Sequence, residues 1–90
     1  MDLDQIRKDI DQIDQELVAL LERRMVCVGQ IVEYKEQQSL PVLDQRRERE
    51  VLEKVGSLVT EEQYRATIQA QFQDMMKRSR DFQEEVRVRD

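Results

Sequence analysis

Apolar positions recur at alternate steps of three and four residues through the first part of the chain. They are Leu3, Ile6, Ile10, Ile13, Leu17 and Leu20. This spacing is typical of one face of an α-helix, on which residues three or four apart lie on the same side. The pattern predicts a long helix over about 4–38, ending before Pro41 because a proline disfavours helix in the residue that precedes it.

Two further helices are predicted after a short loop over 39–43. Asp44 is a good N-cap for a second helix over about 44–58. Thr60 and Gln63 have the spacing of a capping box, which predicts a third helix over about 60–87, with segment 84–90 fraying. One face of that helix changes from apolar to polar partway along, in the order Tyr64, Ile68, Phe72, Met75 or Met76, then Ser79 and Gln83, followed by Val86.

The stripe on the first helix changes from apolar to cationic without leaving its face. Its next positions are Arg24, Cys27, Ile31 and Lys35. Arg24 and Lys35 are eleven residues apart, which is about three helical turns, so their side chains point the same way. A charge within a packing stripe is costly unless it has a partner, and an anionic ligand is such a partner. The pattern therefore predicts a pocket for an anion, although any single cation could instead extend from the edge of an interface.

The composition supports one all-α domain over residues 1–90. The chain has two glycines, one proline and four aromatic residues, which leaves little from which to build turns and sheets. A net charge of −5 argues against a nucleic-acid partner, and no apolar run approaches the ~20 residues that span a membrane. The N-terminus lacks the pattern of a secretory signal. The single cysteine, Cys27, is interpreted as a small core residue and favours a cytoplasmic location.

The residues that are missing restrict the chemistry. The chain has no histidine, which excludes His-ligated metal sites and acid–base catalysis by histidine. A Cys–His nucleophile is impossible for the same reason, and no Gly-rich phosphate loop is present. We expect no metal and no cofactor. An enzyme with this inventory would work by positioning and electrostatics.

The length of the first helix predicts a homodimer. A helix of about 35 residues is roughly 50 Å long, whereas a compact domain of this size has a radius of gyration near 12 Å. Two shorter helices of the same chain cannot cover it. If two copies pack antiparallel about an axis near Val18 and Ala19, Arg7 of one chain falls level with the stretch between Arg24 and Lys35 of the other. Each pocket would then contain one arginine contributed by the other chain.

The order and spacing of several motifs resemble those of the all-helical chorismate mutases, which are intertwined homodimers of three-helix subunits with a long first helix and no cofactor. The motifs are IR at 6–7, IDQID at 10–14, LLERR at 20–24, Lys35, LPVLD at 40–44, RRE at 46–48, and Ser79 with Gln83. Together they cover nearly the whole chain. The resemblance implies the Claisen rearrangement of chorismate to prephenate, an isomerase reaction on the route to phenylalanine and tyrosine.

The resemblance also implies a role for each candidate site residue. Arg24 and the neighbouring chain's Arg7 would bind the two substrate carboxylates, with Arg47 lining the site and Ser79 adding a hydrogen bond. Lys35 and Gln83 would donate to the ether oxygen. Glu48 would accept from the ring hydroxyl, helped by the backbone around Asp44. The residues expected to act directly in catalysis are Lys35, Gln83, Arg24 and Glu48.

Other interpretations stay open at this point. Glu48 could merely pair with Arg47 or Lys54, and Asp44 is first of all a helix cap. Arg23 and Arg46 are expected on the surface. An isochorismate–pyruvate lyase resembles these mutases in fold and in its basic site, but Glu48 favours the mutase because it offers a partner for the ring hydroxyl. A non-catalytic helical dimer, serving as an interaction or regulatory module, predicts instead that Arg24 and Lys35 are exposed.

Overall fold

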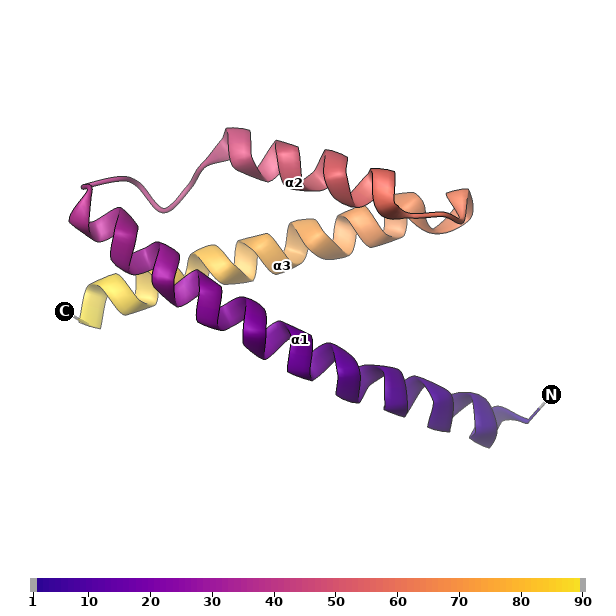
Figure 1. Ribbon diagram of the computed structural model, residues 1–90. Coiled ribbons are helices and arrows are strands. Elements are labelled where there is room, and N and C mark those ends of the chain that lie inside the picture. Colours follow the sequence, from indigo (N-terminus) through magenta and orange to yellow (C-terminus); the bar gives the residue numbers. More distant parts are fainter. Residues whose placement is uncertain (1, 90) are drawn as a thin grey trace.

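A computed structural model describes residues 2–89, and the side chains of residues 2–87 (Figure 1). It contains three helices, α1 (Leu3–Gln37), α2 (Gln45–Leu58) and α3 (Glu62–Arg89), and no strand among the described residues. The prediction of an all-α chain with a long first helix is confirmed. None of these helices has the length and apolar character needed to cross a membrane.

The chain is elongated because α1 reaches far beyond the other two helices. α2 and α3 form a hairpin, and α3 packs against both α2 and α1. The N-terminal half of α1 extends away from this hairpin (Figure 1). The molecule measures 54 × 26 × 15 Å, with a radius of gyration of 16.1 Å. A compact domain of this length would have a radius near 12 Å.

The core is small and lies where the C-terminal half of α1 meets the hairpin. Its buried apolar residues are Val28, Val32, Val42, Val55 and Met76. By contrast, the apolar stripe of α1 stays open to solvent, with residues from Leu3 to Leu20 between 37% and 58% exposed. Within one chain, nothing in the described residues covers this stripe.

Polar contacts close the α2–α3 hairpin at its tip. Arg65 donates from Nε to the carbonyl oxygen of Gly56 at 2.9 Å, and Gln69 donates from Nε2 to that of Leu52 at 3.0 Å. Gly56 is buried against α3, where a Cβ atom would overlap the Gln69 side chain. These contacts fix the alignment of α2 along α3 independently of the residues nearer the other end of the hairpin.

The loop between α1 and α2 is tied down at several points. Ser39 has a φ of 55°, in the left-handed region that commonly ends a helix, and Leu40 donates from its backbone nitrogen to the carbonyl oxygen of Lys35 at 2.8 Å. Val42 is buried, with 4% of its surface exposed. The Asp44 side chain accepts from the backbone nitrogen of Arg47 at 3.0 Å, so the predicted N-cap of α2 is confirmed.

Three details differ from the sequence-based expectations. Cys27 is exposed, because Val28 and Val32 are the residues that α1 buries in this region. α3 begins at Glu62, and no described hydrogen bond joins Thr60 to Gln63, so the capping box there was wrong.

The third difference concerns the C-terminal segment, which was expected to fray. α3 instead continues to Arg89, although Asp90 lies outside the described residues. Arg87 donates from Nη2 to the carbonyl oxygen of Leu40 at 2.7 Å, and its Nε lies 4.0 Å from Oε1 of Glu36. These tertiary contacts hold a segment that its own composition would leave loose.

Candidate active site

A cavity of about 140 Å³ lies between the C-terminal half of α1, the following loop, and the facing sides of α2 and α3. All three helices and the loop supply lining side chains. They are Arg24, Val28, Ile31, Lys35, Val42, Asp44, Arg47, Glu48, Val51, Met76, Ser79, Arg80 and Gln83. Seven of the eight predicted site residues therefore lie around one cavity, and Arg7 is the exception.

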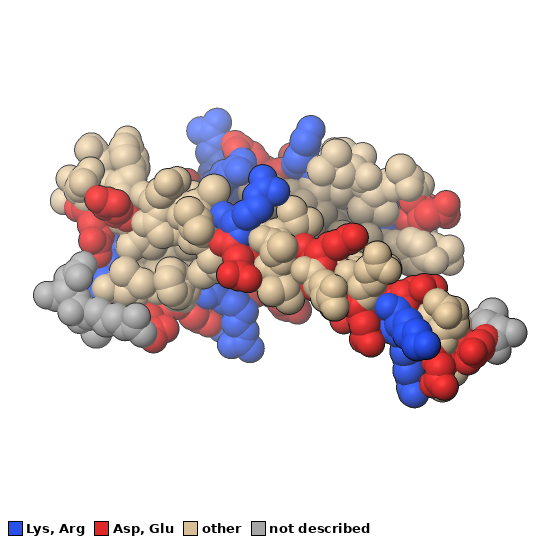
Figure 2. Space-filling view, turned by 60° about the horizontal axis from the view of Figure 1, so that its bottom comes forward, with Lys and Arg blue, Asp and Glu red and all other residues tan. Residues whose placement is uncertain are grey.

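Four of the lining side chains are cationic and two are acidic. On the outer face drawn in Figure 2, Lys and Arg side chains are instead interspersed with Asp and Glu side chains. The chain as a whole carries a net charge of −5. The cavity is therefore a local positive region in an acidic protein, as binding of an anion requires.

Arg24 reaches from α1 to α3. Its Nη1 donates to Oγ of Ser79 at 2.9 Å. Ser79 is buried, with 7% of its surface exposed, and Arg24 is half-buried. The hydroxyl oxygen is neutral, so this contact orients the guanidinium without compensating its charge.

Lys35 is held in a similar way by the loop. Its Nζ donates to the carbonyl oxygen of Val42 at 2.7 Å, and the side chain is half-buried. Again the partner is neutral. The shared direction of Arg24 and Lys35, which the spacing predicted, brings both cations to one cavity.

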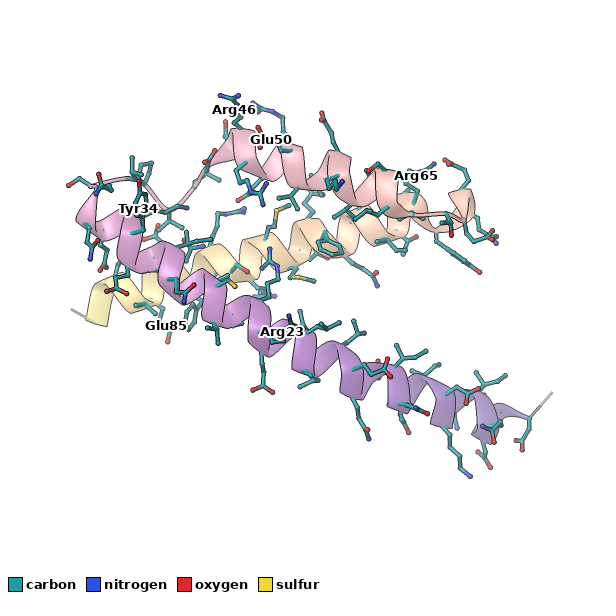
Figure 3. All side chains as sticks on the ribbon, in the orientation of Figure 1. Arg23, Tyr34, Arg46, Glu50, Arg65 and Glu85 are labelled. Carbon is teal, nitrogen blue, oxygen red and sulfur yellow. The ribbon has the colours of Figure 1, made fainter. Side chains whose placement is uncertain are left out.

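The first turn of α2 forms another wall. Asp44 caps the helix, and Arg47 lines the cavity with 68% of its side chain exposed and Nη1 at 4.0 Å from Oε2 of Glu50. Arg46 and Glu50 lie on the side of α2 turned away from α3 (Figure 3), 3.4 Å apart between Nε and Oε1. Arg46 is thus on the surface as expected, and so is Arg23.

Glu48 pairs with a residue that sequence reasoning missed. Nη1 of Arg80 donates to both carboxylate oxygens of Glu48, at 2.5 and 2.6 Å. The side chains are 28% and 24% exposed, respectively. The suggested pairing of Glu48 with Arg47 or Lys54 was wrong. A usable signal was present, since Arg80 precedes Gln83 by three residues and so shares a helix face with it.

Gln83 is buried among these groups without a partner for its amide oxygen. It is 7% exposed, and its Oε1 makes no hydrogen bond in the described part of the chain. Buried polar atoms in folded proteins are nearly always paired, and each exception calls for an explanation. Because Gln83 lines the cavity, its unpaired amide oxygen can accept a hydrogen bond from a molecule bound there, whereas donation from the same side chain would use Nε2.

Arg7 lies apart from this cluster. It is exposed on the N-terminal half of α1, seventeen residues before Arg24, which corresponds to about 25 Å along a straight helix. One chain therefore does not bring Arg7 to the cavity. Its contribution from a second chain stays a prediction.

Two comparisons with known proteins give matches for this chain. A family model described as chorismate mutase type II matches residues 6–84, a range that contains Arg7 and every cavity-lining residue. The chain is also 41% identical over 54 residues to a bifunctional chorismate mutase/prephenate dehydratase of Aquifex aeolicus. That alignment covers 60% of this chain and 15% of the length of the relative.

No solved structure matches the chain. The family model nevertheless extends over most of the sequence and over the whole of the cavity. The resemblance seen in the sequence motifs is thereby confirmed, and the chain belongs to the chorismate mutase type II family.

Proposed function

We propose that the chain catalyses the Claisen rearrangement of chorismate to prephenate at this cavity. The reaction breaks one ether C–O bond and forms one C–C bond within a single molecule. It needs no nucleophile, base or metal. It needs the flexible dianion held in its reactive conformation and donors placed at the ether oxygen, where negative charge develops.

One observation carries the proposal: the two half-buried cations of α1 are bound to neutral oxygens. Arg24 donates to a hydroxyl and Lys35 to a backbone carbonyl. Both are therefore oriented while their charges stay uncompensated. A cavity built in this way favours a ligand with several negative charges, because half-buried charges gain more from a partner than exposed ones do.

The other lining groups have roles that suit the same substrate. Arg24 binds one carboxylate, with Ser79 beside it, and Arg47 lines the mouth. Lys35 and the Gln83 amide donate to the ether oxygen, and Glu48 accepts from the ring hydroxyl near the Asp44 backbone. A modest rate gain of roughly 10⁶-fold requires about 8 kcal/mol. One preorganised donor supplies about 3 kcal/mol, so two donors and conformational restraint would suffice.

A homodimer completes the proposed site. The exposed apolar stripe on α1, which no described residue of the same chain covers, would be buried by the α1 helix of a second copy. Antiparallel pairing would bring Arg7 of that copy to the cavity, where it would bind the second carboxylate. A cytoplasmic location belongs to the same proposal.

The test is direct. Purified protein is incubated with chorismate, whose loss is followed by ultraviolet absorption, and the product is converted in acid to phenylpyruvate. Arg24→Ala and Lys35→Ala are expected to lose turnover by roughly 10²-fold or more. Arg23→Ala and Lys54→Ala, which alter exposed residues outside the cavity lining, are the matched controls and should keep it.

The alternatives predict other outcomes of that assay. Turnover of isochorismate but not chorismate would indicate the lyase. A folded protein that turns over neither would indicate the non-catalytic module. The half-burial of Arg24 and Lys35 at a cavity argues against that module, which requires them to be exposed.

A further inference from the structure

We propose that Arg80 is a positioning residue of this site, which orients the Glu48 carboxylate toward the substrate's ring hydroxyl and thereby sets the preference for a ring-hydroxylated substrate. This inference rests on the proposed function, because it takes Glu48 as the acceptor for that hydroxyl. Arg80 itself need not touch the substrate.

The geometry of the pair is that of a fixed carboxylate. One nitrogen, Nη1 of Arg80, lies 2.5 Å from Oε1 and 2.6 Å from Oε2 of Glu48. Contact with both oxygens restricts rotation of the carboxylate about its terminal bond. Each oxygen has two acceptor positions, so each keeps one for another donor. Since both side chains line the cavity, a substrate hydroxyl could reach such a position.

No other described hydrogen bond or ion pair holds the side chain of Glu48. Arg47, its neighbour on α2, points to Glu50 at 4.0 Å and is largely exposed. Arg80 comes from the opposite helix and approaches across the α2–α3 boundary, with 28% of its side chain exposed. The orientation of Glu48 therefore depends on a contact made by α3 and not on its own helix.

The charges distinguish the role of Arg80 from that of the other cavity cations. Arg24 and Lys35 have neutral partners and keep their charge for the substrate. The charge of Arg80 is compensated by Glu48. Arg80 therefore orients the Glu48 carboxylate, which accepts from the substrate hydroxyl, and adds little attraction for the carboxylates of the ligand.

The fold should tolerate loss of this pair. The α2–α3 hairpin is also closed by the contacts of Arg65 and Gln69 with backbone carbonyls of α2. The latter contact, to Leu52, lies one helical turn beyond Glu48. Removal of Arg80 leaves these contacts in place, so a variant can report on activity rather than on folding.

The experiment compares two substrates, chorismate and its analogue that lacks the ring hydroxyl. We expect Arg80→Met to lower kcat/KM for chorismate about tenfold, as loss of one hydrogen bond to a charged group would, with little change for the analogue. The kcat/KM for chorismate divided by that for the analogue should therefore fall by about the same factor. Arg80→Lys keeps the charge but not the guanidinium geometry, so its ratio should fall to an intermediate value.

Two controls separate positioning from structure. Arg78→Met makes the same change on the same helix at a side chain that is 83% exposed, and its ratio should equal that of the wild type. In Glu48→Gln, which weakens the acceptor, the added Arg80→Met change should have little further effect on the ratio, because the two residues act as one unit.

An unchanged ratio in folded Arg80→Met, or an equal loss on both substrates, would overturn the proposal. A folding defect in Arg80→Met would lower both rates alike and would show in far-ultraviolet circular dichroism. In that case the ratio of the two kcat/KM values is measured for Arg80→Lys instead. A fall in this ratio would support the proposal, and a ratio equal to that of the wild type would overturn it. A wild-type protein that does not rearrange chorismate would overturn the proposed function, and this inference with it, before any variant is compared.

Discussion

The Arg24 guanidinium and the Ser79 hydroxyl meet across the boundary of α1 and α3, 2.9 Å apart. Ser79 accepts this hydrogen bond through its oxygen, so its own proton is free to be donated to a ligand. One small side chain can therefore orient a cation and contact the anion that the cation binds.

Ser79→Ala should lower kcat/KM for chorismate about tenfold, because the variant loses a donor and leaves Arg24 less well oriented. The free energy of unfolding should fall by about 1 kcal/mol. Steady-state kinetics and urea unfolding measure the two effects. Ser57→Ala is the control, since within the described part of the chain this exposed hydroxyl donates only to the carbonyl oxygen of Lys54. Full activity in Ser79→Ala would remove Ser79 from the site.

Gln83→Glu should make activity dependent on acid. An amide donates a hydrogen bond at any ordinary pH, whereas a carboxyl group donates only when protonated and is largely ionised at about pH 7. The protonated fraction grows as pH falls, so the variant should be weak at neutral pH and gain kcat/KM toward about pH 5 and below. The exposed Gln73→Glu on the same helix should follow the wild-type profile. Equal neutral-pH activity in Gln83→Glu would contradict the role of Gln83 as a donor.

Leu17→Glu should prevent dimerisation. Leu17 is 48% exposed within one chain and lies in the middle of the α1 stripe that we propose to pair. A carboxylate placed there would be buried without a partner in the dimer, which is unfavourable. Sedimentation at micromolar concentration should show monomers with little activity. Gln12→Glu, on the opposite side of the helix, should stay dimeric. A fully active dimer of Leu17→Glu would place the interface elsewhere.

Arg7→Ala and Arg24→Ala should complement each other. Each homodimer alone lacks one arginine in both sites and should be nearly inactive. If Arg7 acts on the neighbouring chain, a mixed dimer contains one intact site, and random exchange of equal amounts restores about a quarter of the wild-type activity. Native mass spectrometry verifies the exchange. Mixed dimers without recovered activity would show that Arg7 does not act across the interface.

Local sequence patterns were sufficient to predict the helices and many of the residues that line the cavity. The direction shared by Arg24 and Lys35 follows from helix geometry alone, and the Asp44 cap depends on residues within one turn. Such features are decided by neighbours in the sequence, so they can be inferred before any packing is known.

Contacts between distant segments could not be inferred in this way. Arg80 is 32 residues from Glu48, and nearer cations on α2 offered equally simple partners. Only the packing of α2 against α3 selects Arg80. The contact of Arg87 with Leu40, 47 residues away, could not be inferred either. It holds the C-terminal end of α3, which the sequence predicted to fray.

The contact between Arg87 and the Leu40 carbonyl bears on the cost of ordering Lys35. The loop over 39–43 is tied by Arg87 at Leu40 and by burial of Val42, whose carbonyl holds the Lys35 ammonium. Because the loop is already restricted in the folded chain, Lys35 loses less conformational entropy when a ligand binds. The rest of that loss is incurred once, when the chain folds, and is not repeated at each turnover.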